Sequence, residues 1–189
     1  MLLGLDVSPL VRPHPPGVVR AVEGLARALE ASGKVEVVRL APESGEDLRR
    51  WRQRRLPALV AELALDGLHS TVSAFPLRAR CRRVQTVHEL PWRHGVAENA
   101  DLRHRLWAAV GPLVADRVVC PSEHVARDLR RRLLPGASGV RVVPWGCGPP
   151  FSDEPAPGEV DELRLERYRL GEDPIALCVG AVRECGKCQ

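Results

Sequence analysis

The chain has 189 residues, of which 44% are hydrophobic and 28% are charged, and its formal net charge is +4. These values are typical of a soluble globular protein and exclude a disordered tail, a coiled coil and a low-complexity segment. At roughly 100 to 200 residues per domain, the length accommodates one domain but not two complete ones.

Neither membrane insertion nor export is indicated. The sequence lacks a run of about 20 consecutive apolar residues, which a membrane-spanning helix needs. The first residues include Asp6 and carry no basic leader, unlike a signal peptide. The six cysteines are scattered rather than spaced as in a secreted disulfide framework. We therefore expect a cytoplasmic protein.

The first 40 residues have the pattern of a βαβ unit. Residues 2–7 form a short apolar run, which predicts a buried strand, and residues 8–17 contain turn-forming residues. From Val18, apolar residues recur at three- and four-residue spacing, which predicts a helix that ends at Gly33. Residues 35–40 predict a second strand, so the unit belongs to a parallel sheet.

The alternation of strands and helices continues to residue 143. Four more strands are predicted at residues 68–72, 84–87, 117–120 and 140–143. Helices are predicted at 46–65, with a break or a fresh start at Pro57, at 100–114, kinked near Gly111-Pro112, and at 123–134, capped by Ser122. This succession predicts an α/β fold with a Rossmann-like, doubly wound parallel sheet.

The last 44 residues are predicted to lie outside the Rossmann-like domain. Residues 1–145 form the Rossmann-like domain, and residues 146–173 begin with many glycines and prolines and read as a linker. Residues 174–182 are a strongly apolar strand, which would need further elements to cover its faces. We therefore expect residues 174–189 to begin a second domain that is truncated.

The start of the first helix is a candidate phosphate site. Pro16 and Gly17 stand at the helix N-terminus, where backbone N–H groups and the helix dipole favour an anion. Arg20, one turn further on, adds positive charge. The alternative is that Gly17 only permits a tight turn, because one glycine is a weak motif.

His88 is the candidate catalytic residue. It follows the fourth predicted strand in the segment TVHELP at residues 86–91. Ligands of open α/β sheets bind at the carboxyl ends of the strands, and a histidine there can donate to a substrate hydroxyl or orient a leaving group. The alternative is a histidine that satisfies backbone groups at the strand end. His69 is expected to pack, and His14 and His124 to lie on a loop and a helix surface.

The densest charge is the run from Arg49 to Arg55, which includes Trp51. Arginines interleaved with an aromatic residue suit an anionic membrane surface or a phosphorylated acceptor, and the alternative is a solvated helix face. No recognised nucleic-acid-binding module surrounds the run, so we expect no nucleic-acid partner. Cys185 and Cys188 lack the further ligands of a structural zinc site, so no metal is expected.

Several segments, taken in order, resemble the N-terminal half of a family-four-type glycosyltransferase of the GT-B fold. They are LGLDVSP at 3–9, PGVVRAV at 16–22, DGLHS at 66–70, TVHELP at 86–91, ADRVVCPSEHVARDL at 115–129, VRVVPWGCGPPF at 140–151 and IALCVGAVR at 175–183. The sequence departs from the family pattern at Val19, Glu89 and Trp145, where a small residue, an aspartate and an asparagine are usual.

The resemblance implies a retaining transfer of a sugar from a nucleotide-diphosphate donor to a glycan or lipid-linked acceptor, with no cofactor. It implies that this domain holds the acceptor, that His88 lies near the transferred sugar, and that Gly17 lies near the donor phosphates. Arg183 and Lys187 then share in stabilising the departing diphosphate. A lipid-linked acceptor is consistent with peripheral contact at the inner membrane face through residues 49–55.

We expect the 189 residues alone to have no measurable transferase activity, because most of the nucleotide-sugar domain is missing.

Two alternatives to an acceptor-side transferase domain stay open. The chain could instead be a free-standing Rossmann-like binding module, or a subunit that pairs with a separately encoded C-terminal domain. The second alternative, a protein that binds nucleic acid, rests on the high arginine content alone.

Overall fold

The computed structural model describes residues 1–90, 102–132 and 139–146, together with residues 154, 157, 158, 162, 168 and 169. The chain divides into two compact units, Met1–Gly146 and Cys147–Gln189. The first unit is the one described below. The predicted linker at 146–173 and the predicted strand at 174–182 lie mostly or wholly outside the described residues, so these two predictions stay predictions.

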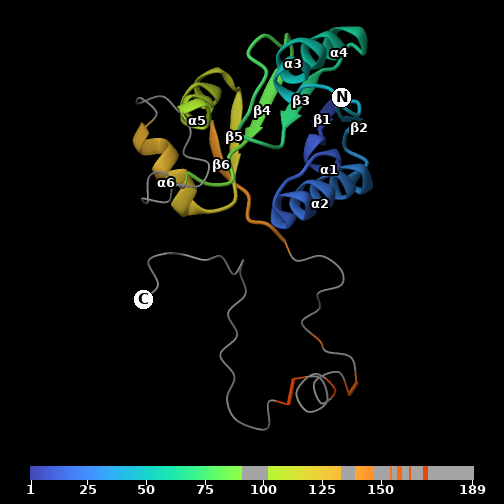
Figure 1. Ribbon diagram of the computed structural model, residues 1–189, viewed down its shortest axis with the longest axis vertical. Coiled ribbons are helices and arrows are strands. Elements are labelled where there is room, and N and C mark those ends of the chain that lie inside the picture. The colour runs from blue at the N-terminus through green and yellow to red at the C-terminus, as the bar shows by residue number, and fades with distance from the viewer. Residues whose placement is uncertain are drawn as a thin grey trace. The chain divides into compact units, whose positions relative to one another are not determined.

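The first unit is built on a six-stranded parallel sheet in the order β2-β1-β3-β4-β5-β6 (Figure 1). Its strands are β1 Leu2–Asp6, β2 Glu36–Leu40, β3 Gly67–Ser70, β4 Arg82–Thr86, β5 Arg117–Cys120 and β6 Val140–Val142. The six strands predicted before residue 144 are confirmed, each with ends within two residues of the predicted ones. The chain moves from β1 to β2 on one side and returns to β3 on the other, so the winding reverses between β1 and β3.

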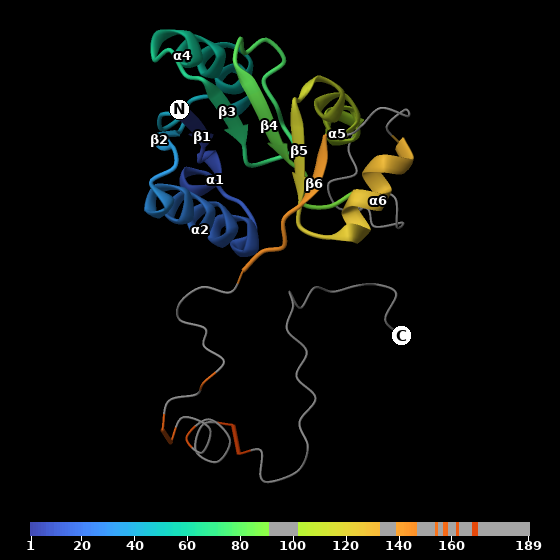
Figure 2. The same ribbon diagram turned by 180° about the vertical axis from the view of Figure 1, so that it is seen from behind.

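Helices cover both faces of this sheet. They are α1 Ser8–Val11, α2 Pro16–Ser32, α3 Leu48–Arg50, the π-helical turn η1 Trp51–Arg55, α4 Leu56–Glu62, α5 Leu102–Val114 and α6 Glu123–Arg132. Figures 1 and 2 show α1 and α2 on one side of β1 and β2, with α3 and α4 on the other. The predicted Rossmann-like, doubly wound α/β fold is therefore confirmed.

Alternate residues of β1 pack into different cores. Leu5 is fully buried with Val22 and Ala26 of α2. Gly4 faces the opposite way, and a β-carbon there would collide with the side chains of Leu65 and Leu40. That second core contains the buried residues Trp51, Leu56, Val60 and Leu68. A third core lies where α6 packs on β5 and β6, so the sheet is covered along its length.

Several helix boundaries differ from prediction, most of them by two or three residues. Residues 8–11, predicted as part of a loop, form the short helix α1, with Pro9 in its first turn. The next helix begins at Pro16 rather than at Val18, and it ends as predicted, with Gly33 left-handed at φ 62°. Ser122 caps α6 as predicted, because its Oγ accepts the Val125 N–H over 3.3 Å. Within the described residues, no helix is both long and apolar enough to span a membrane.

The packing of α5 on β4 can be tested at Gly111. A β-carbon at position 111 would lie inside van der Waals distance of the Gln85 side-chain amide. Gln85 is fully buried and its Nε2 donates to the Ser73 carbonyl over 2.6 Å, so it cannot move without losing that bond. We expect Gly111→Ala to lower the free energy of unfolding by about 1–3 kcal/mol in urea denaturation.

Gly24 on α2 provides the matched control. It is exposed, and no atom lies within 4 Å of a β-carbon built there. Gly24→Ala should therefore stabilise the protein by roughly 0.5–1 kcal/mol, because alanine restricts the unfolded chain and favours helix. A Gly111→Ala variant as stable as wild type would contradict the close approach of α5 to β4.

Candidate functional site

The carboxyl ends of β1, β3 and β4 gather polar side chains at one edge of the sheet. Asp6 ends β1, Thr71 directly follows β3, and His88 lies two residues beyond the end of β4. Because β1 and β3 flank the point where the winding reverses, this edge is where ligands of open α/β sheets bind. We take it as the candidate site.

Asp6 is held by a buried charge pair. Its side chain is fully buried, and its Oδ2 lies 3.6 Å from Nε of Arg52 on η1, whose side chain is 10% exposed. Oδ1 of Asp6 accepts the Ser8 N–H over 2.9 Å, and Ser8 Oγ in turn accepts from Arg52 over 2.9 Å. Burial raises the pKa of the Asp6 carboxyl, while Arg52 and the hydrogen bonds to Ser8 favour its ionised form.

Thr71 links Asp6 to His88. Its hydroxyl donates to the Asp6 carbonyl over 2.6 Å. Its own carbonyl oxygen lies 2.7 Å from Nε2 of His88. A carbonyl oxygen only accepts, so the His88 Nε2 carries the proton and donates. The three residues therefore form a continuous hydrogen-bonded chain across β1, β3 and β4.

The His88 ring is half-buried and stacks on Trp145, which follows β6. The ring centroids are 5.1 Å apart and the planes differ by 6°. Burial lowers the pKa of His88 below its ordinary value, against the opposing effects of the Thr71 carbonyl and of Glu89, and His14 lowers it further. This shift favours the neutral ring at pH 7, in which the Nδ1 lone pair can accept a hydrogen bond.

His69, on β3, is a buried neighbour rather than a ligand-facing group. It is 8% exposed, and its Nε2 shares a hydrogen bond with Thr86 Oγ1 over 2.9 Å. Burial, and secondarily the nearby His88, lowers the pKa of His69 to about 4. The expectation that His69 has a packing role agrees with this environment.

The predicted phosphate site at Gly17 has few donors. Gly17 lies in the first turn of α2, where Pro15 and Pro16 carry no N–H group, and the Val18 and Val19 N–H groups both donate to the Pro15 carbonyl. This leaves the Gly17 N–H to meet an anion at this helix end. No atom lies within 4 Å of a β-carbon at Gly17, so packing does not require glycine there. Arg20 is exposed on the same helix.

The arginine-rich run is not the uniform surface that its sequence indicates. Trp51 is 1% exposed and Arg52 is 8% exposed, so both point into the protein. The expectation that an aromatic residue here faces a membrane or an acceptor is therefore wrong for Trp51, which fills the core beneath α4. Arg49, Arg50, Arg54 and Arg55 are exposed. Arg183 and Lys187, assigned by resemblance to the donor diphosphate, lie outside the described residues.

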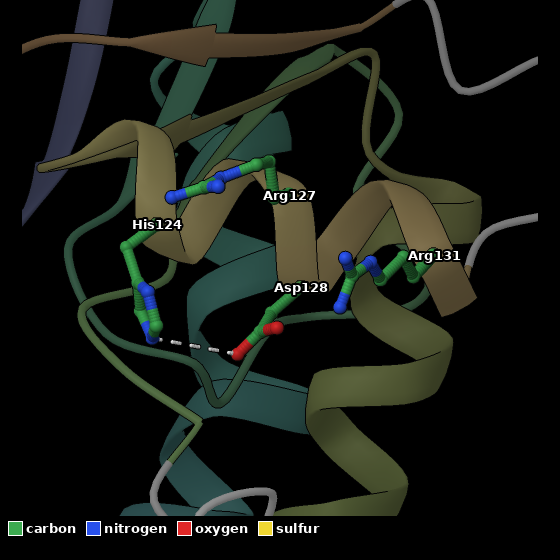
Figure 3. Close-up of a pocket in the computed structure, with 4 residues that line it drawn as sticks. All are labelled: His124, Arg127, Asp128 and Arg131. Atoms are coloured by element: carbon green, nitrogen blue, oxygen red, sulfur yellow. Dashed lines mark ion pairs between the residues drawn. The ribbon is translucent and has the colours of Figure 1, made fainter.

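A shallow depression of about 120 Å³ lies on α6, lined by His124, Arg127, Asp128 and Arg131 (Figure 3). The four residues follow helical spacing along α6, where His124, Arg127 and Arg131 are exposed and Asp128 is buried, and His124 Nε2 lies 3.9 Å from Asp128 Oδ2. The depression is well below the roughly 300 Å³ of ordinary small-molecule pockets. We therefore keep the sheet edge as the candidate site.

No group of three or more His, Cys, Asp or Glu side chains in the described part of the chain is arranged to hold a metal ion. Cys185 and Cys188 lie beyond that part. The residues of the candidate site are instead hydrogen-bonding groups and one aromatic face.

Sequence reasoning missed Asp6, Arg52, Thr71 and Trp145 as members of the site. Asp6 carried a usable signal, since a charged residue closing an apolar strand must find a partner. Arg52 carried a weaker one, its helical spacing of four and eight residues from the buried Leu56 and Val60. Thr71 and Trp145 belong to the site through contacts to His88 that are distant in sequence. Thr71 lies 17 residues before His88 and accepts its N–H, and Trp145 stacks on the His88 ring.

The buried pair predicts different effects for two arginines of the same run. Arg52→Met should lower the free energy of unfolding by about 3 kcal/mol or more, because it leaves the Asp6 carboxylate buried without its counter-charge. Arg54→Met, at an exposed position, should change it by no more than about 0.5 kcal/mol. Urea denaturation of the two variants measures the difference. Equal effects would show that Arg52 is not paired inside the protein.

The low pKa of His69 predicts a pH-dependent stability. Between pH 6.5 and about 4, the unfolded chain binds a proton on His69 that the folded protein does not. The free energy of unfolding should therefore fall as the pH drops through this window, by about 3 kcal/mol in total, and be insensitive to His69 above it. His88 acts in the same direction, whereas Asp6, with its raised pKa, acts in the opposite one.

Comparison of His69→Gln with wild type isolates this contribution. Urea denaturation from about pH 7 to about pH 4.5 should give a smaller fall in the variant, because glutamine does not titrate. Parallel pH profiles would mean that His69 takes up its proton in the folded protein.

The sequence matches no protein-family model and no curated protein. The function of the site is therefore inferred from its geometry and its motifs.

Proposed function

We propose that this domain is the acceptor-side domain of a retaining, nucleotide-sugar-dependent glycosyltransferase with GT-B architecture. The observation that carries the proposal is the position of His88 at the carboxyl edge of the sheet, with Nε2 on the Thr71 carbonyl and the ring stacked on Trp145. The order of the motifs from LGLDVSP to VRVVPWGCGPPF, which resembles that enzyme class, supports it. Fold alone would not, since Rossmann-like sheets serve many unrelated functions.

The chemistry of His88 suits a hydroxyl-bearing ligand. The ring is neutral and its Nε2–H is already used by the Thr71 carbonyl, so Nδ1 is left as an acceptor. A sugar hydroxyl donates such a bond. This refines the sequence-based expectation that His88 donates to the substrate, because donation would require the protonated ring.

Trp145 adds an apolar surface beside this acceptor. One face of its indole is covered by His88, and the side chain is 43% exposed. An exposed indole edge and face pack well against the C–H face of a sugar ring while neighbouring polar groups bind its hydroxyls. In the proposed function, His88 and Trp145 therefore orient the acceptor sugar.

The donor diphosphate is assigned to other residues. The α2 N-terminus contributes the Gly17 N–H and the charge of Arg20, which is a modest site for two phosphates. We therefore assign most of the charge stabilisation to Arg183 and Lys187, at the segment resembling the first strand of the donor domain. A lipid-linked acceptor would bring the exposed arginines Arg49, Arg50 and Arg54 close to anionic headgroups at the cytoplasmic face.

Acceptor binding can be measured on the chain itself. We expect a saccharide from a panel of mono- and disaccharides to shift the NMR signals of Thr71, His88 and Trp145. His88→Gln should weaken this binding at least ~5-fold, the effect of losing one hydrogen bond. His124→Gln, which changes the same residue type on the exposed face of α6, should bind as wild type does.

Two results would contradict the proposal. The first is a panel in which no saccharide perturbs this edge of the sheet. The second is turnover of a nucleotide sugar by the 189 residues alone, above that of His88→Ala, which would overturn the acceptor-side assignment. If the chain binds a saccharide but transfers no sugar even when a C-terminal nucleotide-sugar domain is supplied, a pure binding module would be favoured.

A further inference from the structure

Thr71 occupies a central position in the hydrogen bonding of the site. It is 1% exposed and directly follows β3. Its hydroxyl donates to the carbonyl of Asp6, and its carbonyl accepts from His88. One residue therefore contacts both neighbouring strand ends, through its side chain on one side and its backbone on the other.

The acceptor for the Thr71 hydroxyl is itself fixed. Asp6 is fully buried, its backbone belongs to β1, and its carboxylate is held by the Ser8 N–H and by Arg52. The Asp6 carbonyl therefore has little freedom to move. A hydrogen bond to it holds the first residue after β3 in one orientation, which also fixes the direction of the Thr71 carbonyl.

That carbonyl determines the state of the His88 ring. Because it can only accept, it selects the tautomer with the proton on Nε2. The stacking of the ring on Trp145 fixes its plane. Together the two contacts leave Nδ1 aimed in one direction as a hydrogen-bond acceptor.

We infer that Thr71 is the positioning residue for His88, and that it sets the tautomer and orientation of the imidazole before any ligand binds. Thr71 acts through its hydroxyl bond to Asp6, which holds its carbonyl in place. The identity of the ligand that meets Nδ1 rests on the proposed function, whereas the state of the ring does not.

NMR spectra of the His88 ring in the ligand-free chain test this inference. In wild type we expect one protonated nitrogen, Nε2, one unprotonated nitrogen, Nδ1, and a slowly exchanging Nε2 proton. Thr71→Val keeps the carbonyl and the side-chain shape but removes the hydroxyl. It should make the Nε2 proton exchange at least ~5-fold faster, as loss of one hydrogen bond does, and give a mixture of tautomers. Thr71→Ser restores the hydroxyl and should restore the wild-type spectrum.

Thr86→Val is the matched control. Thr86 is a buried threonine on the neighbouring strand, 3% exposed, and its hydroxyl bonds to His69 instead of to His88. We expect this variant to lower the melting temperature as Thr71→Val does, while the His88 signals stay as in wild type. A merely structural role for Thr71 predicts the same His88 spectrum in both variants.

Each remaining outcome counts against the inference. Unchanged exchange and nitrogen signals in Thr71→Val would overturn it, and so would a Thr71→Ser variant that fails to restore them. The wild-type spectrum is a second test that does not depend on the variants folding. A proton on Nδ1, or a rapidly exchanging Nε2 proton, would overturn the inference by itself. Failure to bind any saccharide would overturn the proposed function and leave these spectra unaffected.

Discussion

The carboxyl edge of this sheet depends on the buried pair of Asp6 and Arg52. Removing two charges from water costs several kcal/mol per ion, so a buried pair persists only where further hydrogen bonds satisfy its atoms. Here Ser8 supplies part of them, with its N–H to Asp6 Oδ1 and its hydroxyl to Arg52, while Asp6 Oδ2 and Arg52 Nε face each other over 3.6 Å without a hydrogen bond. The pair therefore holds η1 against the end of β1 and makes the Asp6 carbonyl a fixed acceptor for Thr71. The orientation of His88 follows from that acceptor.

The strands were predictable because their burial makes the sequence locally rich in apolar residues. Parallel strands covered on both faces tend to appear as short apolar runs, and their alternation with helical patterns located six strands before residue 144. Length alone did not identify them, because apolar runs of similar length at 58–61 and 106–110 lie in α4 and α5. The helix after β2 was harder to interpret. Its buried residues Trp51, Leu56 and Val60 are spaced by five and then four, so the first interval breaks the α-helical period. The π-helical turn, in which the Leu56 N–H donates to the Trp51 carbonyl, absorbs the extra residue.

Arg52 lies four residues before Leu56 and eight before Val60, so helical spacing alone places it on the buried face. It was missed because its charge and its place in a run of arginines favoured an exposed position. The site was only partly predictable for a related reason. His88 could be found from its place after an apolar strand, but its tautomer depends on a carbonyl 17 residues earlier. Trp145 reaches the ring only because β6 brings the chain back beside β5, the neighbour of β4.

The state of His88 also limits what it contributes to the proposed transfer. A neutral imidazole whose N–H is committed to the protein offers a lone pair, which orients a hydroxyl but does not offset the charge of a departing diphosphate. The α2 N-terminus adds little to that task, because two prolines and the bonds to the Pro15 carbonyl use up most of its N–H groups. In the proposed enzyme, this domain therefore positions the acceptor, and the charge stabilisation must come from the residues that hold the donor.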